Sequence, residues 1–162
     1  MTFTIRTAKA TDASAIADVA VASIRGLGAN FYDAAQIEAW SAAFTPESVQ
    51  ASFVTGITWV AVDDGQVVGF AKWEPPTEFD LLYVHPNAAG TGVARALSDA
   101  LERAAINAGV FHLEGTVSRS ARAAFDSFGY ERVEEATRHV GGQSFAVARM
   151  RKNFDEELRR VF

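Results

Sequence analysis

Cysteine is absent from this chain of 162 residues. Its absence excludes disulfide bridges, thiolate metal sites and any covalent mechanism that passes through a cysteine nucleophile. The chain has three histidines, at scattered positions that do not form the ligand spacing of a typical metal site. We therefore expect chemistry that needs neither a protein thiol nor a bound metal.

Positive charge and long hydrophobic runs are also scarce. The 15 lysines and arginines are outnumbered by 20 aspartates and glutamates, which gives a net charge of -5. Proteins that bind nucleic acid usually carry a basic face, so we expect no nucleic-acid partner. No apolar run approaches the length that spans a membrane, and the first residues alternate like a strand instead of resembling a signal peptide. These features favour a cytoplasmic protein without a membrane partner.

The order of expected elements indicates one α/β domain over residues 1–152, followed by a short tail at 153–162. Asp12 is expected to cap the first helix. Alternation and turn residues predict strands at 2–7, 57–62, 66–73, 79–84, 110–117, 130–140 and 144–150. Helical spacing predicts helices after Asp12, at 34–43, from Pro46, at 93–107 and around 121–128. The main order is β-α-α-β-β-β-α-β-α-β-β, which predicts a mixed sheet, and the apolar tail with the closing hairpin could form a homodimer contact.

The most informative segment is 82–97, where an apolar strand runs into a small-residue loop and then into an amphipathic helix. Gly90, Gly92 and Ala94 carry no bulky side chain, so the backbone there can approach a ligand closely. The helix directs its unpaired N–H groups and its positive dipole end into the loop. Such a loop binds phosphate, and Arg95 in the first helical turn can reach the same anion.

This order of elements, with a glycine loop after the fourth strand, resembles the Gcn5-related N-acetyltransferase (GNAT) superfamily over nearly the whole chain. Gly92 and Ala94 match the last two positions of that family's loop pattern, Gln/Arg-x-x-Gly-x-Gly/Ala. The segment 118–130 is similar to a second family motif, which ends in a glycine followed by an aromatic residue. The segments 5–8, 23–25 and 36–40 are also similar to a bacterial subgroup, the YafP-like acetyltransferases.

The resemblance implies a GNAT-type three-layer fold around a central mixed, mostly antiparallel sheet. It also implies an enzyme that moves an acetyl group from acetyl-CoA to a primary amine in a direct ternary complex, without a metal. The pantetheine would lie between the fourth and fifth strands. The residues that the resemblance assigns to coenzyme A are Leu82, Tyr83, Val84, Ala89, Gly90, Thr91, Gly92, Val93, Ala94, Arg95, Ser118, Arg122 and Phe125.

Three positions depart from the family pattern. Ala89 stands where the pattern has Gln or Arg, and Ser118 stands where many members carry an asparagine that contacts the cofactor. Phe125 stands where many members carry the tyrosine that protonates the departing thiolate. These departures keep a second function open, a non-catalytic acyl-CoA-binding regulatory protein with the same fold. A mononucleotide site would need strand–helix alternation, which the central run of three strands does not provide.

Asp80 is the first candidate for the general base, because it lies in an otherwise apolar strand close to the expected thioester. Alternation would place it on the face of Leu82 and Val84, where it could take a proton through water. A strand-end carboxylate that pairs with a neighbour or faces solvent is the structural alternative. Glu78 is the second candidate, and the available phenols for the acid are Tyr130 and Tyr83. The acceptor pocket is expected to be walled by aromatic residues, among them Phe31, Tyr32, Trp40 and Trp73.

Overall fold

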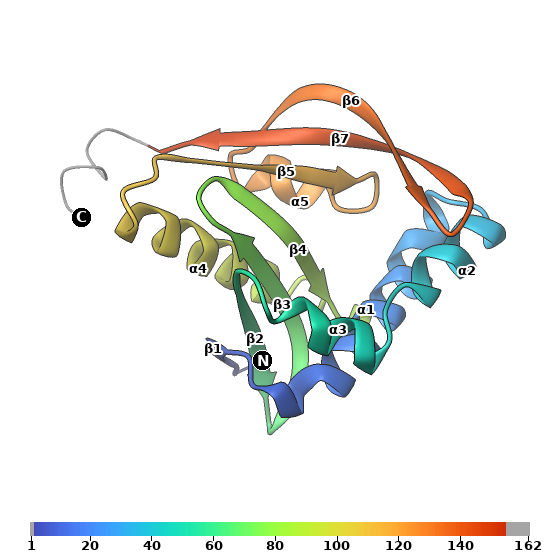
Figure 1. Cartoon of the computed structure of the whole chain (residues 1–162), viewed down its shortest axis with the longest axis horizontal. Coiled ribbons are helices and arrows are strands. Elements are labelled where there is room, and N and C mark those ends of the chain that lie inside the picture. The colour runs from blue at the N-terminus through green and yellow to red at the C-terminus, as the bar shows by residue number, and fades with distance from the viewer. Residues whose placement is uncertain (1, 155–162) are drawn as a thin grey trace.

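The computed structural model describes residues 2–154, which form one seven-stranded sheet covered by helices (Figure 1). The strands lie in the order β1-β2-β3-β4-β5-β7-β6, and every neighbouring pair is antiparallel except β4 and β5. The strands are β1 Thr4–Thr7, β2 Ile57–Asp63, β3 Gln66–Glu74, β4 Glu78–Val84, β5 His112–Ser118, β6 Glu131–Val140 and β7 Gln143–Asn153. The helices are α1 Ala13–Leu27, α2 Ala34–Ala42, α3 Pro46–Ser52, α4 Val93–Asn107 and α5 Arg122–Ser127. This mixed, mostly antiparallel fold confirms the predicted class.

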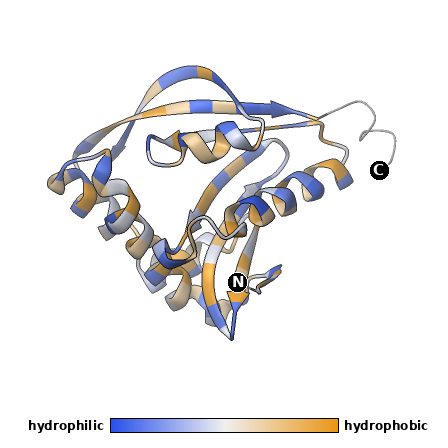
Figure 2. Cartoon of the chain, turned by 180° about the vertical axis from the view of Figure 1, so that it is seen from behind, coloured by the Kyte–Doolittle hydropathy of each residue, from blue (hydrophilic) through white to orange (hydrophobic). Residues whose placement is uncertain are grey.

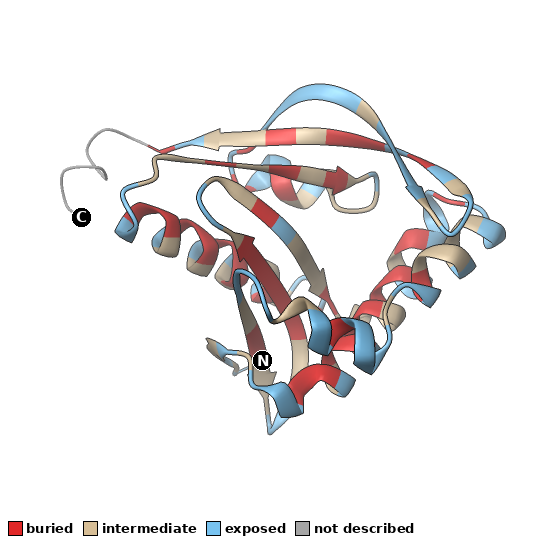
Figure 3. Cartoon of the chain, viewed as in Figure 1, coloured by how far each residue is buried: buried red, intermediate tan, exposed pale blue. Residues whose placement is uncertain are grey.

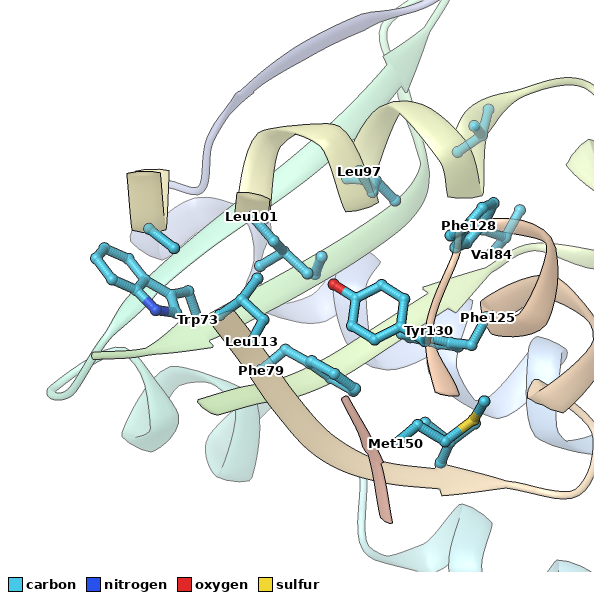
Figure 4. Packing of buried hydrophobic residues seen from close by; sticks show 14 of the residues in the cluster. Trp73, Phe79, Val84, Leu97, Leu101, Leu113, Phe125, Phe128, Tyr130 and Met150 are labelled. Atoms are coloured by element: carbon cyan, nitrogen blue, oxygen red, sulfur yellow. The ribbon is translucent and has the colours of Figure 1, made fainter. Parts of the chain in front are cut away.

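Helices cover the sheet on both faces, which produces the three layers. On one face, α4 buries Leu97 and Leu101 in the main hydrophobic core, together with residues of α5 (Figures 3 and 4). On the other face, Ile16 of α1 packs with Val60 of β2 and Phe70 of β3 in a second cluster. Hydrophobic and hydrophilic residues alternate along these helices at helical spacing (Figure 2). Burial of the apolar stripes on both sides holds β3 and β4 rigidly at the centre of the molecule.

Local signals explain the short helices between α1 and the sheet. The Asp33 carboxylate accepts a hydrogen bond from the Gln36 N–H at 2.8 Å, and the Gln36 side chain accepts one from the Asp33 N–H at 2.8 Å. This capping box satisfies two N–H groups at the start of α2. Thr45 and Ser48 form the same reciprocal pair at α3, where Pro46 occupies the first turn. These caps direct α2 toward β7 and α3 toward α1.

The start of α1 differs from the prediction in its detail. The helix begins directly after Asp12, as expected, but the Asp12 side chain does not cap it. The carboxylate instead accepts two hydrogen bonds from the Arg6 guanidinium, at 2.7 and 3.0 Å, and one from the Lys9 N–H at 2.7 Å. Three charge-assisted bonds outcompete a single bond to the helix N–H, so Asp12 ties α1 to β1.

The last strand extends slightly beyond the expected domain boundary at residue 152. Strand β7 continues to Asn153, and the Phe154 side chain is buried in the main core. The rest of the predicted tail, residues 155–162, lies outside the described residues, and with it most of the apolar tail expected at a dimer contact. Within residues 2–154, no helix is both long enough and apolar enough to cross a membrane.

Candidate active site

The candidate site lies where β4 and β5 separate. The two strands pair at a single position, Glu78 opposite Glu114, beside a hydrogen bond from the Glu114 N–H to the Thr77 carbonyl at 2.8 Å. Figure 1 shows the strands running apart beyond this point. The edge of β4 that faces β5 therefore keeps unpaired backbone groups from Leu81 to Val84. Two cavities open into this gap.

The larger cavity, here called the loop cavity, has a volume of about 330 Å³. Its walls come from the end of β4, the loop before α4, the end of α1 and the start of α5. The lining residues include Ser23, Ile24, Leu27, Val84, Ala88, Ala89, Gly90, Gly92, Ala94, Arg95, Ser120, Ala124 and Phe128. The cavity thus joins the segment that carries the phosphate-binding pattern to the open edge of β4.

Backbone geometry explains the small residues of this loop. Gly90 has a φ of 75° and Gly92 a φ of 92°, in the left-handed region where a side chain is strained. Apart from the chain neighbours, no atom of residues 2–154 lies within 4 Å of the place where a Cβ would sit on either glycine. The Thr91 hydroxyl donates to the Ala88 carbonyl and closes the turn. The first N–H groups of α4 have no partner inside the helix, and Gly92, Ala94 and Arg95 at its start line the cavity.

Arg95 supplies the positive charge at the rim of the loop cavity. Its guanidinium donates to the Ser127 carbonyl at 3.2 Å and lies 5.6 Å from the centroid of the Phe128 ring. Both contacts hold the side chain across the gap between α4 and the end of α5. An anion bound at the loop would find the helix dipole and this charge on the same side.

The smaller cavity, here called the aromatic cavity, has a volume of about 120 Å³. Five of its rings contact one another and form a continuous wall. The centroid of the Trp40 ring lies 5.7 Å from that of Tyr32, 6.1 Å from that of Tyr83 and 5.9 Å from that of Phe145, and Phe44 lies 5.3 Å from Tyr83. Both cavities share the residues Trp40, Leu82, Tyr83, Ser118 and Ala121. A ligand in one cavity can therefore meet a ligand in the other at these shared residues.

Tyr32 fastens the segment between α1 and α2 to the strands. Its hydroxyl donates to the Ala146 carbonyl at 2.8 Å and accepts from the Arg119 N–H at 2.9 Å. Tyr32 is buried, and the Arg119 guanidinium adds a hydrogen bond to the Phe31 carbonyl at 3.3 Å. These contacts set the aromatic wall against β7 and the loop after β5, and the wall contains Tyr32 and Trp40, two of the residues expected around the acceptor. Trp73, also expected there, packs in the main core and lines neither cavity.

Asp80 lies at an irregularity in β4 that the sequence pattern does not reveal. Lys72 of β3 is paired with Leu81, and the next residue, Trp73, is paired with Phe79, so Asp80 is left between the two pairs. This β-bulge breaks the alternation of side chains along the strand. Asp80 was expected on the same face as Val84, but Phe79 is the residue that packs with Val84 in the main core. Asp80 is exposed and lines the aromatic cavity. Its carboxylate forms no hydrogen bond or ion pair with any residue in the range 2–154.

Tyr83 lines both cavities and contributes a hydroxyl group to the site. The indole N–H of Trp40 donates to this hydroxyl at 3.2 Å, which leaves the hydroxyl proton available for another acceptor. Burial raises the pKa of Tyr83 to about 12, although the hydrogen bond from Trp40 acts in the opposite direction. The ring stacks on Phe70 with centroids 5.3 Å apart, so its position is set by the core.

The other two catalytic candidates lie away from both cavities. The carboxylate of Glu78 is held by the Arg149 guanidinium at 2.5 and 3.1 Å, and Arg149 also pairs with Glu114 at 3.4 Å. Tyr130 is 3% exposed and packs among Phe79, Phe125 and residues of α4 (Figure 4). Burial raises the pKa of Tyr130, although the Ser98 hydroxyl acts in the opposite direction. Within residues 2–154, no cluster of histidine, aspartate and glutamate could hold a metal ion.

Most residues expected to contact coenzyme A line the loop cavity, but four do not. Val93 is fully buried beneath the loop, and the side chain of Thr91 is turned to Ala88. Arg122 forms an ion pair with Glu135 at 2.9 Å. Phe125 lines the aromatic cavity and stacks on Phe79 at 4.9 Å. The loop-cavity residues that were predicted are Leu82, Tyr83, Val84, Ala89, Gly90, Gly92, Ala94, Arg95 and Ser118.

Sequence reasoning missed several lining residues. Ser23 and Ile24 were not predicted to line a cavity, because nothing local on α1 distinguishes a core position from a cavity position. Arg138 lies on the exposed edge strand β6 and lines the aromatic cavity, facing the same space as Asp80. No sequence signal distinguishes Arg138 from other arginines in an alternating strand. Arg138 reaches the cavity because β6 pairs with β7.

Comparisons with known proteins agree with this geometry. The acetyltransferase (GNAT) domain model matches residues 28–154. The chain is 34% identical to the crystal structure described as a GCN5-related N-acetyltransferase (aminotransferase, class II) from Rhodopseudomonas palustris, with a TM-score of 0.90 over 95% of this chain and 97% of that one.

Two more distant structures carry a bound ligand. The PaiA N-acetyltransferase from Thermoplasma acidophilum, in complex with coenzyme A, is 18% identical, with a TM-score of 0.79 over 95% of this chain and 100% of that one. The yncA acetyltransferase structure from Salmonella typhimurium, with acetyl-CoA, is 20% identical, with a TM-score of 0.63 over 96% and 95%. No curated protein matches the sequence. At these identities the two structures support the fold.

Proposed function

Because the chain belongs to the acetyltransferase (GNAT) domain family, we propose that it transfers an acetyl group from acetyl-CoA to a primary amine while both are bound. The observation that carries this proposal is the meeting of two cavities between β4 and β5. One cavity has a loop suited to phosphate, and the other is an aromatic pocket with charged residues. Their shared residues mark where the thioester and the amine would react.

The loop cavity supplies the donor site in this proposal. The N–H groups at the start of α4 would bind the pyrophosphate, since the glycine backbone leaves room for it and Arg95 adds charge. Ala89 removes one side-chain contact of the family pattern, so backbone groups carry most of the binding. The pantetheine would lie along β4, whose edge from Leu81 to Val84 is unpaired. The bound coenzyme A and acetyl-CoA of the two distant structures support this choice of donor.

Asp80 and Tyr83 provide the proton transfers. The Asp80 carboxylate takes a proton from the ammonium group through water, and the neutral nitrogen attacks the thioester carbonyl. The carbon–sulfur bond then breaks, and the Tyr83 hydroxyl donates its proton to the leaving thiolate. The attacking nitrogen loses its second proton, which returns through water to the Tyr83 oxygen. Tyr83 suits this step because its pKa of about 12 keeps it protonated near neutral pH and Trp40 occupies only its oxygen. The reaction yields an amide, free coenzyme A and one proton released to solvent.

Glu78 and Tyr130 receive no step in this mechanism. The ion pair with Arg149 occupies the Glu78 carboxylate, and Tyr130 is enclosed in the core. Ser118 lines both cavities and hydrogen-bonds to Ser120 at 2.9 Å. We assign Ser118 to the donor side, at the family position that many members fill with asparagine.

We also propose that the chain falls in the YafP-like subgroup. Two of the three segments that carry this resemblance, 23–25 and 36–40, contribute residues to the site. Ser23 lines the loop cavity, and Trp40 lines both cavities. The similarity is therefore concentrated where donor and acceptor would bind.

A second function is the alternative to acetyl transfer, because Phe125 stands where many family members carry a tyrosine. A regulatory protein could bind acyl-CoA in the loop cavity without transferring the acyl group. Release of free thiol from acetyl-CoA, measured with amino acids, polyamines, aminoglycosides and peptide N-termini, separates the two functions. Amine-dependent release with an N-acetylated product by mass spectrometry supports the transferase. Tight coenzyme A binding in calorimetry without release on any amine would favour the regulator.

A further inference from the structure

The aromatic cavity carries two charges of opposite sign, on residues that form no ion pair with each other. Asp80 projects from the bulge of β4, and Arg138 lies on β6, opposite Phe145 of β7. Both residues are exposed and line the same cavity. Neither side chain has a hydrogen-bond or ion-pair partner among residues 2–154. Because both side chains are exposed, water solvates the two charges in the free protein, and both stay available to a ligand that enters the cavity.

Most of the other lining residues are apolar or aromatic, although Thr116 and Ser118 also line the cavity. Trp40, Phe44, Tyr83 and Phe145 form the connected wall, and Phe79 with Phe125 stack as a pair within 4.9 Å. The volume is about 120 Å³. A cavity of about 150 Å³ is known to accept a benzene molecule. The space therefore suits one branched aliphatic or small aromatic side chain, with its polar groups at the charged residues.

The arrangement of charge argues against a polycation. A polyamine or an aminoglycoside would be repelled by Arg138, the only basic residue among residues 2–154 in the lining, and would gain from Asp80. An acceptor that carries an anionic group satisfies Arg138 by a bidentate, charge-assisted pair. Its amine then faces Asp80, the base of the proposed reaction.

We propose that the acceptor is an α-amino acid with an apolar side chain, whose carboxylate pairs with Arg138 and whose amine faces Asp80. The assignment rests on the proposed function and names its substrate class. The side chain of the amino acid packs against the aromatic wall, so leucine and phenylalanine are the probes of choice. The reacting nitrogen then points toward Leu82 and Ser118, the residues shared with the loop cavity.

The test compares each amino acid with the amine that lacks its carboxylate. L-leucine is set against isoamylamine and L-phenylalanine against phenethylamine, with phosphoethanolamine as the arm that distinguishes phosphate from carboxylate. For each compound, kcat/KM with acetyl-CoA is measured, and binding to the coenzyme A complex is measured by calorimetry. We expect the wild type to prefer the amino acids by about 10-fold or more, and the preference to fall close to one in Arg138→Gln.

Arg132→Gln is the matched control. Arg132 lies on the same strand, is about half exposed and pairs only with Glu135, outside both cavities. We expect this variant to keep the wild-type preference. Both variants alter exposed side chains, and unchanged coenzyme A affinity verifies that each is folded.

The outcomes separate this inference from the proposed function. Equal use of amino acids and decarboxylated amines, or a preference that survives in Arg138→Gln, overturns the inference and leaves the transferase intact. A preference for phosphoethanolamine over both amino acids overturns the carboxylate assignment. Arg138-dependent binding of amino acids without turnover of any amine supports the inference and overturns the transfer reaction.

Discussion

The indole N–H of Trp40 donates a hydrogen bond to the Tyr83 hydroxyl at 3.2 Å, at the point where the two cavities meet. The bond joins α2 to β4 and orients the hydroxyl, while the stacking of Tyr83 on Phe70 holds the ring. Trp40 donates its hydrogen bond to the Tyr83 oxygen, so the phenolic proton stays available for another acceptor. In the proposed mechanism that proton goes to the leaving thiolate.

Replacement of Tyr83 tests this step. We expect Tyr83→Phe to lower kcat by about 100-fold, because general acid catalysis contributes at least this much. The KM for acetyl-CoA should change far less. Tyr130→Phe is the control, since Tyr130 is buried outside both cavities, and its kcat should equal that of the wild type. Equal loss of activity in both variants would assign Tyr83 a structural role.

The pH profile gives a second readout of Tyr83. Its pKa is raised to about 12, so the hydroxyl stays protonated as pH rises from 7 to 10 and loses its proton only above that range. We therefore expect kcat of the wild type and kcat of Tyr83→Phe to depend on pH in the same way between pH 8 and pH 10. A decline near pH 10 in the wild type alone would mean that Tyr83 titrates like an exposed tyrosine.

Substitution of Asp80 tests the base. We expect Asp80→Asn to lower kcat by about 100-fold or more, because asparagine cannot accept the proton of the ammonium group. The coenzyme A affinity should stay at the wild-type value, since Asp80 lines only the aromatic cavity. Asp64→Asn, at the exposed turn between β2 and β3, is the matched control. Retained turnover in Asp80→Asn would remove Asp80 from the mechanism.

The glycine loop is tested by a pair of strained substitutions. Gly92 and Gly142 have φ values of 92° and 79°, and beyond the chain neighbours no described atom lies within 4 Å of where a Cβ would sit on either. Alanine at either position should cost about 1–2 kcal/mol of stability through backbone strain. Only Gly92→Ala should also weaken coenzyme A binding, by about 10-fold, because it shifts the N–H groups that would hold the phosphate. Equal coenzyme A affinities in the two variants would place the phosphate elsewhere.

The Arg6–Asp12 contact predicts how stability depends on pH. The hydrogen bonds from Arg6 hold the pKa of Asp12 below its usual value of 3.8. Stability from this pair is therefore fully present above pH 3.8 and is lost as pH falls through the lower folded-state value. We expect Asp12→Asn to reduce the free energy of unfolding by about 1 kcal/mol at pH 7, since Arg6 is partly exposed. Urea titrations should find a smaller difference at pH 3 than at pH 7.

Local signals in the sequence predicted most of the fold but only part of the site. The hairpin through Asp64 and Gly65, the glycine loop and the start of α4 depend on neighbouring residues, so they can be recognised in sequence. The bulge at Asp80 depends on strand pairing, which single-strand patterns do not encode, and the separation of β4 from β5 was expected only from the family resemblance. Arg138 reaches the cavity only through the register of β6 on β7. The donor loop was therefore recognisable, and most of the acceptor cavity was not.

The central claim is that donor and acceptor meet between β4 and β5 and react directly. Initial rates of thiol release, with acetyl-CoA and the amine varied together, test it most directly. Direct transfer in a ternary complex predicts double-reciprocal lines that intersect and no thiol release without amine. Parallel lines, or thiol release at the same rate without amine, would contradict the account.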